Sequence, residues 1–135
     1  MDFKADTITI TSTGMGINPA GSSTVSLKAN SITIESTGSS AIHGKEEATV
    51  ILDAPTITLT GNNEALLMTN TGKPTGKIII GSDAGTTLNA NGDIKIEANK
   101  TLELNNTRVI VKAGEQVEVS NLEGSNATFV FNSLT

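Results

Sequence analysis

Residues 7–12 read TITITS, and nearly the same letters return as SITIES at residues 31–36 and as TITLTG at residues 56–61. The first displacement is 24 positions and the second is 25. Within each copy, polar residues alternate with branched aliphatic ones, the pattern of a β-strand with one face in a core and one in water. Self-similarity at a fixed period of this size indicates a repeat architecture.

Two further strands follow in each copy. Residues 25–27 return at 50–52, and Ile17 returns as Ile42 and then as Leu67. Three strands and three turns per period make one coil of a parallel β-helix, in which each residue stacks on its counterpart in the next coil at about 4.8 Å. The predicted inward columns are Ile8/Ile32/Ile57, Ile10/Ile34/Leu59, Ile17/Ile42/Leu67, Val25/Val50/Ile78 and Leu27/Leu52/Ile80.

The sequence therefore predicts an all-β fold, a single-stranded parallel β-helix of about five coils of roughly 23 to 28 residues, with helix content near zero. A β-sandwich or jelly roll is the alternative, because it also produces closely spaced short strands. Gly14, Gly38 and Gly61 follow the first strand of each repeat, and we expect them at corners with positive φ. The expected organisation is one domain over 1–135, with clear repeats at 7–30, 31–55 and 56–80, degenerate coils over 86–131 and a loop insertion at 69–76.

Composition narrows the class of function. The formal net charge is -5 and the nine basic residues are scattered, which argues against a nucleic-acid partner. Cysteine is absent, so disulfides and thiolate metal sites are excluded. The start of the chain shows no apolar run typical of a signal peptide, and apolar runs such as residues 78–80 are far shorter than the 20 or so residues that span a membrane.

The residues that carry chemistry form no catalytic set. His43 is the single histidine, and we expect a surface or turn position for it rather than a catalytic or metal-binding one. Glu46 and Glu47 are adjacent, so an extended backbone would point them apart, and the other acidic residues are explained by solubility. Asn105 and Asn106 are expected at a corner, where asparagine tolerates left-handed backbone and can form ladders between coils. The sequence predicts no catalytic residue, no metal, no cofactor and no enzymatic activity.

The segments DTITITSTGMGINPAGSSTVSLKANSITIESTGSSAIHG and ATVILDAPTITLTGNNEALLMTN resemble the passenger repeats of bacterial autotransporter adhesins of the type V secretion family. The resemblance covers residues 6 to about 131, although its motifs are degenerate. It implies a right-handed parallel β-helix at the surface of a Gram-negative-type bacterium or outside it, serving adhesion, aggregation or biofilm formation. The export signals of that family, a signal peptide and a membrane barrel, are not found in this chain.

Two surfaces are the candidate functional sites. The first is an outer polar face of stacked strands that carries Thr7, Thr9, Thr11, Ser31, Thr33, Thr56, Thr58 and Thr60. The second is the pair of solenoid ends, where Phe3, Phe129 and Phe131 are candidate caps or stacking contacts.

The expected function is a non-enzymatic structural or adhesive module. Its partners would be copies of itself, including filaments formed by end-to-end stacking, and a host or bacterial surface ligand. One alternative is an ice-binding solenoid that uses the Thr-x-Thr face, and thermal hysteresis would test it. Another is a phage or secreted β-helix that binds polysaccharide, although such sites are usually lined with aromatic residues and this chain has only three.

Overall fold

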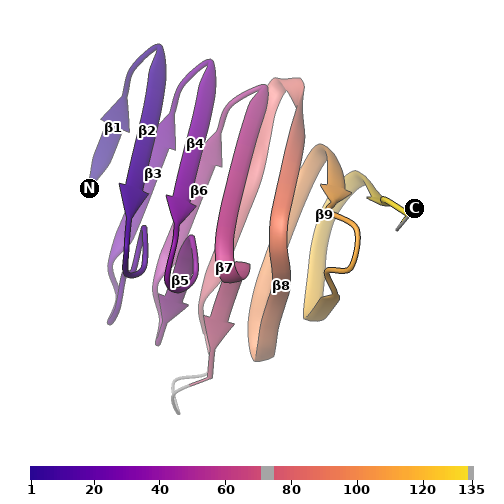
Figure 1. The fold of residues 1–135 in the computed structure, drawn as a ribbon. Coiled ribbons are helices and arrows are strands. Elements are labelled where there is room, and N and C mark those ends of the chain that lie inside the picture. Colours follow the sequence, from indigo (N-terminus) through magenta and orange to yellow (C-terminus); the bar gives the residue numbers. More distant parts are fainter. Residues whose placement is uncertain (71–74, 134–135) are drawn as a thin grey trace.

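The computed structural model describes residues 1–70 and 75–133 of the chain. Within these ranges the molecule is all-β, contains no helix and is wound as a parallel β-solenoid of about five coils (Figure 1). Every pairing between different strands of the described residues is parallel, which excludes the antiparallel sandwich for them. The predicted fold class is therefore confirmed.

In the described part of the chain, nine strands make up the solenoid, and the last three are long because they continue around corners. They are β1 (Asp2–Lys4), β2 (Thr7–Ser12), β3 (Thr24–Lys28), β4 (Ser31–Ser36), β5 (Ile42–Lys45), β6 (Thr49–Asp53), β7 (Thr56–Thr69), β8 (Lys77–Val111) and β9 (Val117–Phe131).

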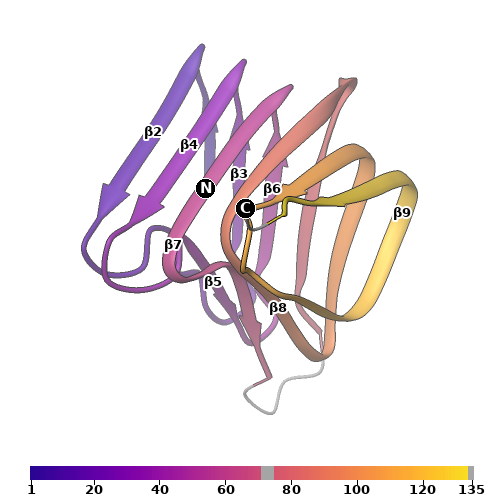
Figure 2. The same ribbon diagram turned by 45° about the vertical axis from the view of Figure 1, so that its right-hand side comes forward.

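The coils have three sides, which are visible where the stack is turned (Figure 2). The threonine side contains β2, β4, residues 56–60 of β7, 87–91 and 107–111 of β8 and 127–131 of β9. The ion-pair side contains β1, β3, β6, residues 77–81 and 101–105 of β8 and 121–125 of β9. The third side contains Ile17, β5, residues 66–68 of β7, 94–96 of β8 and 117–119 of β9.

Four of the five predicted inward columns are confirmed residue by residue. The third column is wrong at its last member, because Ile42 pairs with Leu66 rather than Leu67. From Leu59 to Leu66 the chain advances seven positions, whereas the preceding coil advances eight between its equivalent residues. The shorter corner moves Leu66 into the core and turns Leu67 outward beside His43.

The prediction for Gly14, Gly38 and Gly61 is also wrong, because none of them has positive φ. A Cβ at Gly38 would lie 2.4 Å from the carbonyl oxygen of Thr13, and one at Gly61 would lie 1.8 Å from that of Glu64. These two glycines are required by close approach of backbone to backbone. Left-handed backbone occurs instead at Gly21, Gly85, Gly92, Gly114, Gly124, Glu46, Asn99, Asn106 and Asn126.

One corner contains a buried cation that the sequence did not suggest. The side chain of Lys100 is fully buried, and its ammonium donates hydrogen bonds to the backbone oxygens of Glu46 and, at 3.0 Å, Thr75. Burial lowers the pKa of Lys100. Thr75 belongs to the predicted loop insertion 69–76, of which residues 71–74 lie outside the described residues. Lys100 therefore holds the returning end of this segment against the solenoid.

Candidate functional site

The eight polar residues predicted for the outer face lie together on the threonine side. Thr7, Ser31 and Thr56 are partners in register and form one row. A second row is Thr9, Thr33 and Thr58, and a third is Thr11, Glu35 and Thr60. With neighbouring strands about 4.8 Å apart and alternate residues roughly 6.7 Å apart along a strand, the rows form a flat grid of hydroxyl and methyl groups.

The grid loses its threonine character towards the C-terminal coils. The next coil continues the rows with Thr87, Asn89 and Asn91, and the amide of Asn91 donates to the Thr60 hydroxyl at 3.1 Å. Glu35 places a carboxylate in the third row. The grid is therefore polar and regular over four coils without being chemically uniform.

The N-terminal end leaves part of the core open. Phe3 is in register with Leu27, yet it is 52% exposed. A cavity of about 680 Å³ lies beside it, and Ile17 and Val25 are among its lining residues. Phe3 therefore lies at the predicted end without closing it.

The C-terminal end is similarly incomplete. Phe129 and Phe131 continue the columns of Val109 and Val111, and their rings stack with centroids 6.5 Å apart. Phe129 is half-buried and packs on the core, whereas Phe131 is 58% exposed. Both residues lie where the sequence placed them, and apolar surface remains open at this end as well.

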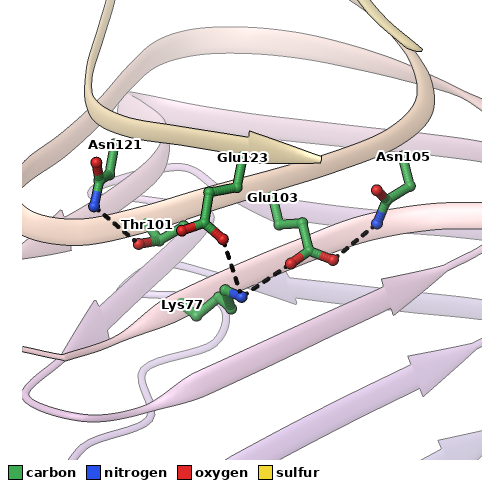
Figure 3. Close-up of polar contacts among 6 residues, drawn as sticks. All are labelled: Lys77, Thr101, Glu103, Asn105, Asn121 and Glu123. Atoms are coloured by element: carbon green, nitrogen blue, oxygen red, sulfur yellow. Dashed lines mark hydrogen bonds and ion pairs between the residues drawn. The ribbon is translucent and has the colours of Figure 1, made fainter. Parts of the chain in front are cut away.

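A group of polar side chains on the ion-pair side was missed from the sequence (Figure 3). The Lys77 ammonium lies 2.9 Å from a carboxylate oxygen of Glu103 and 3.4 Å from one of Glu123. The amide of Asn105 donates to the other oxygen of Glu103 at 2.9 Å. Lys77 and the two glutamates come from three successive coils, so the only sequence signal was their spacing of 26 and 20 residues.

This arrangement places two carboxylates side by side. Glu103 and Glu123 are register partners, and like charges in directly opposed positions destabilise a sheet. Lys77 compensates both of them. Its hydrogen bond to Glu103 raises the pKa of Lys77, and the same bond, together with that from Asn105, lowers the pKa of Glu103.

Replacing Lys77 by methionine is expected to lower the free energy of unfolding at pH 7 by up to about 1 kcal/mol, because the group is partly exposed. The pKa of Glu103 lies below its ordinary value of 4.5, so its contribution is present above that pH and is lost as the pH falls through the lowered value. Urea denaturation followed by circular dichroism at pH 7 and pH 3 measures the difference.

Lys95→Met is the matched control, because Lys95 loses the same charge from a longer, 3.9 Å contact with Glu97. An effect of Lys77→Met that is equally large at pH 3, or an equal effect of Lys95→Met, would contradict the assigned role of Lys77.

His43 lies in β5 and not in a turn. Its ring is half-buried, with Nε2 2.9 Å from the Thr69 hydroxyl and Nδ1 3.1 Å from the sulfur of Met15. Burial, followed by the charge of Lys45, lowers its pKa. The neutral imidazole is thus favoured, and its contacts join three successive coils.

Corner asparagines form part of the predicted ladder. Asn106 has φ of 50° and Asn126 has φ of 62°, and the amide of Asn126 donates to the side-chain oxygen of Asn106 at 2.9 Å. In the ranges that the structure describes, no group of three or more His, Asp or Glu side chains could hold a metal ion.

Comparisons with known proteins found no matching family model, no similar curated protein and no matching solved structure. The resemblance to autotransporter passenger repeats therefore stays a prediction. The described residues contain no helix that is long and apolar enough to cross a membrane.

Proposed function

We propose that the protein is a non-enzymatic structural and adhesive β-solenoid module, displayed outside a bacterial cell. It presents flat polar sides and loops to other surfaces and to copies of itself. The observation that supports this proposal is the threonine side, where polar residues of four successive coils lie in strict register on a rigid parallel sheet.

A flat, regular surface is suited to adhesion for two physical reasons. Its backbone is already ordered, so little conformational entropy is lost when it binds. Its groups repeat from coil to coil, so many weak contacts with a repetitive partner add up to useful avidity. The surface location rests on the resemblance of the repeats to autotransporter passengers.

Adsorption to a hydroxyl-terminated monolayer, measured by quartz crystal microbalance, tests this role. We expect the wild-type protein to adsorb, and we expect Thr33→Lys combined with Thr58→Lys to reduce the adsorbed mass by roughly half or more, because the contacts act together. Both threonines lie in the middle row of the central coils.

The matched control is Ser26→Lys with Ser120→Lys, which adds the same charge away from the threonine side, on the ion-pair side and at the corner between the other two sides. Equal losses in both double variants would show that charge, and not the threonine side, governs adsorption. Absence of wild-type adsorption would contradict the adhesive role.

Ice binding through the threonine side and polysaccharide binding stay alternatives. The stacked Thr-x-Thr rows favour the first, whereas Glu35, Asn89 and Asn91 make the grid less uniform than such a role needs. Thermal hysteresis distinguishes ice binding from adhesion. Retention on an immobilised polysaccharide, with a released-sugar assay to detect cleavage, distinguishes a polysaccharide-binding β-helix from both.

A further inference from the structure

The large apolar side chains that are exposed in the described residues all belong to the first and last coils. These two coils form the opposite ends of the solenoid (Figure 1). Met1 and Phe3 are 74% and 52% exposed at the N-terminal end. Leu122 and Phe131 are 51% and 58% exposed in the last coil. Covering these ends would remove exposed apolar surface from water. It would also pair the edges of β1, β2 and β9, each of which pairs with one strand among the described residues.

We propose that the last coil of one molecule stacks on the first coil of a second copy, in the same parallel pairing that joins coils within the chain. This inference deepens the proposed structural role and rests on it, since it names the partner in self-association. The strands at the two ends of the solenoid belong to the same columns, which allows this pairing.

The ion-pair side supplies the first pair of contacts. Its two inward columns begin at Met1 and Phe3 and end at Leu122 and Gly124. Extending the columns across a junction places Met1 on Leu122 and Phe3 on Gly124. A Cβ at Gly124 would point at the carbonyl oxygen of Leu104 in the preceding coil, so Gly124 projects no side chain into the junction where the phenyl ring would enter.

The threonine side supplies the second pair. Here the inward columns begin at Ile8 and Ile10 and end at Phe129 and Phe131, so the same extension places each isoleucine on a phenylalanine. The four exposed apolar side chains of the two ends are thereby all covered.

The corner between these two sides has the same length at both ends. Phe3 and Thr7 are four positions apart, and so are Gly124 and Thr128, which end the same two columns. One rigid placement can therefore satisfy both sides at once, with strands at the spacing of about 4.8 Å found within a sheet.

The third side is not continued across the junction. The last coil reaches the threonine side after residues 117–119 and 121–125, whereas the first coil begins with β1 on the ion-pair side. Among the described residues, therefore, no strand of either copy fills the third side at the junction, next to the 680 Å³ cavity lined by Ile17 and Pro19. The junction covers two sides of three, so we expect it to be weaker than a contact between coils of one chain.

One charged contact opposes the junction. The outward column that begins at Asp2 ends at Glu123, so stacking brings these two carboxylates together. Lys77, the cation that contacts Glu123, already compensates Glu103 as well. The cation on the strand of Asp2 is Lys4, two positions away from it. Removing the charge of Asp2 should therefore strengthen association.

Complementation of two blocked variants tests the proposal by sedimentation velocity. Phe3→Asp blocks the N-terminal end and Phe131→Asp blocks the C-terminal end. We expect the wild-type protein to form open-ended oligomers whose length grows with concentration, since a head-to-tail contact does not close. We expect each variant alone to be monomeric and their equimolar mixture to form a dimer and nothing larger.

Thr58→Asp, which adds the same charge on the threonine side, is the matched control and should oligomerise as the wild type does. Circular dichroism tests whether each variant is folded. Dimer formation in the mixture is a second test, because it requires both variants to be folded. Dimers of either blocked variant alone would indicate a symmetric contact and overturn the proposal. A wild-type protein that stays monomeric at millimolar concentration would also overturn it.

Asp2→Asn provides a second measurement. It should raise the association constant by up to about five-fold, whereas Asp83→Asn, at an exposed position away from the ends, should not. A wild-type protein that stays monomeric but still adsorbs through the threonine side would overturn the stacking proposal and leave the adhesive role standing. A wild-type protein that stacks but does not adsorb would overturn only the adhesive role.

Discussion

Replacing Ile57 by alanine is expected to lower the free energy of unfolding by about 2 to 5 kcal/mol. Ile57 is fully buried and stacks between Ile32 and Leu88, which are also fully buried. The distance between its neighbours is fixed by the hydrogen bonds of the sheet, so the coils cannot collapse into the cavity. Denaturation by urea, followed by circular dichroism, measures the loss.

Thr58→Ala is the matched control, because Thr58 is the next residue on the same strand and faces outward. Its effect should be within about 0.5 kcal/mol, as for most surface substitutions. Similar losses in the two variants would contradict the assignment of inward and outward faces in β7.

Replacing Gly61 by alanine should destabilise the protein by about 1 to 3 kcal/mol or more, because the new methyl group would collide with backbone. The added Cβ would lie 1.8 Å from the carbonyl oxygen of Glu64 and 3.2 Å from the amide nitrogen of Ala41. Neither atom can move without disturbing the corner or the adjacent coil. The midpoint of thermal unfolding, followed by circular dichroism, measures the effect.

Gly14→Ala is the control, since Gly14 lies in the corner that follows the corresponding strand of the first repeat, two positions after Ser12, the register equivalent of Gly61. A Cβ at Gly14 would meet no atom within 4 Å, and its φ is not positive. Alanine there should be neutral or stabilise the protein by about 0.4 to 1 kcal/mol, because it restricts the unfolded chain. If both variants behaved alike, close backbone approach at Gly61 would not be the reason for glycine.

The fold could be predicted because its core residues recur at a nearly constant spacing along the sequence. Ile8, Ile32 and Ile57 lie on the same column, and their spacing of 24 and 25 residues is visible without any knowledge of the corners. Parallel stacking in register converts such a spacing directly into contacts. The rows of threonines on the outer face followed from the same pattern.

The corners could not be predicted, because they follow no period. The error at Leu67 arose from one residue fewer between the threonine side and the third side. The error at Gly14, Gly38 and Gly61 arose because the same residue type serves left-handed backbone and close packing equally well. Only the backbone conformation and its surroundings distinguish these two reasons.

The contacts of Lys77 were missed for a different reason. Lys77, Glu103 and Glu123 lie in the degenerate coils, where strict sequence repetition has faded. Their outward positions carry no hydrophobic signal, and long charged side chains reach across coils in several ways. Phe3, Phe129 and Phe131 were predicted as caps or stacking contacts from their places near the ends of the repeats, but the column-by-column correspondence of the two ends required the register of β1 and β9.

Because the coils stack in register, the length of this molecule can change independently of the residues on its sides and ends. Each coil is joined to the coil before it and the coil after it, through strands that run in one direction. Inserting or deleting a whole coil would therefore lengthen or shorten the rod by about 4.8 Å without altering either terminal surface. Natural selection can therefore change the length of such a protein through the number of its coils, while its sides and ends stay unchanged.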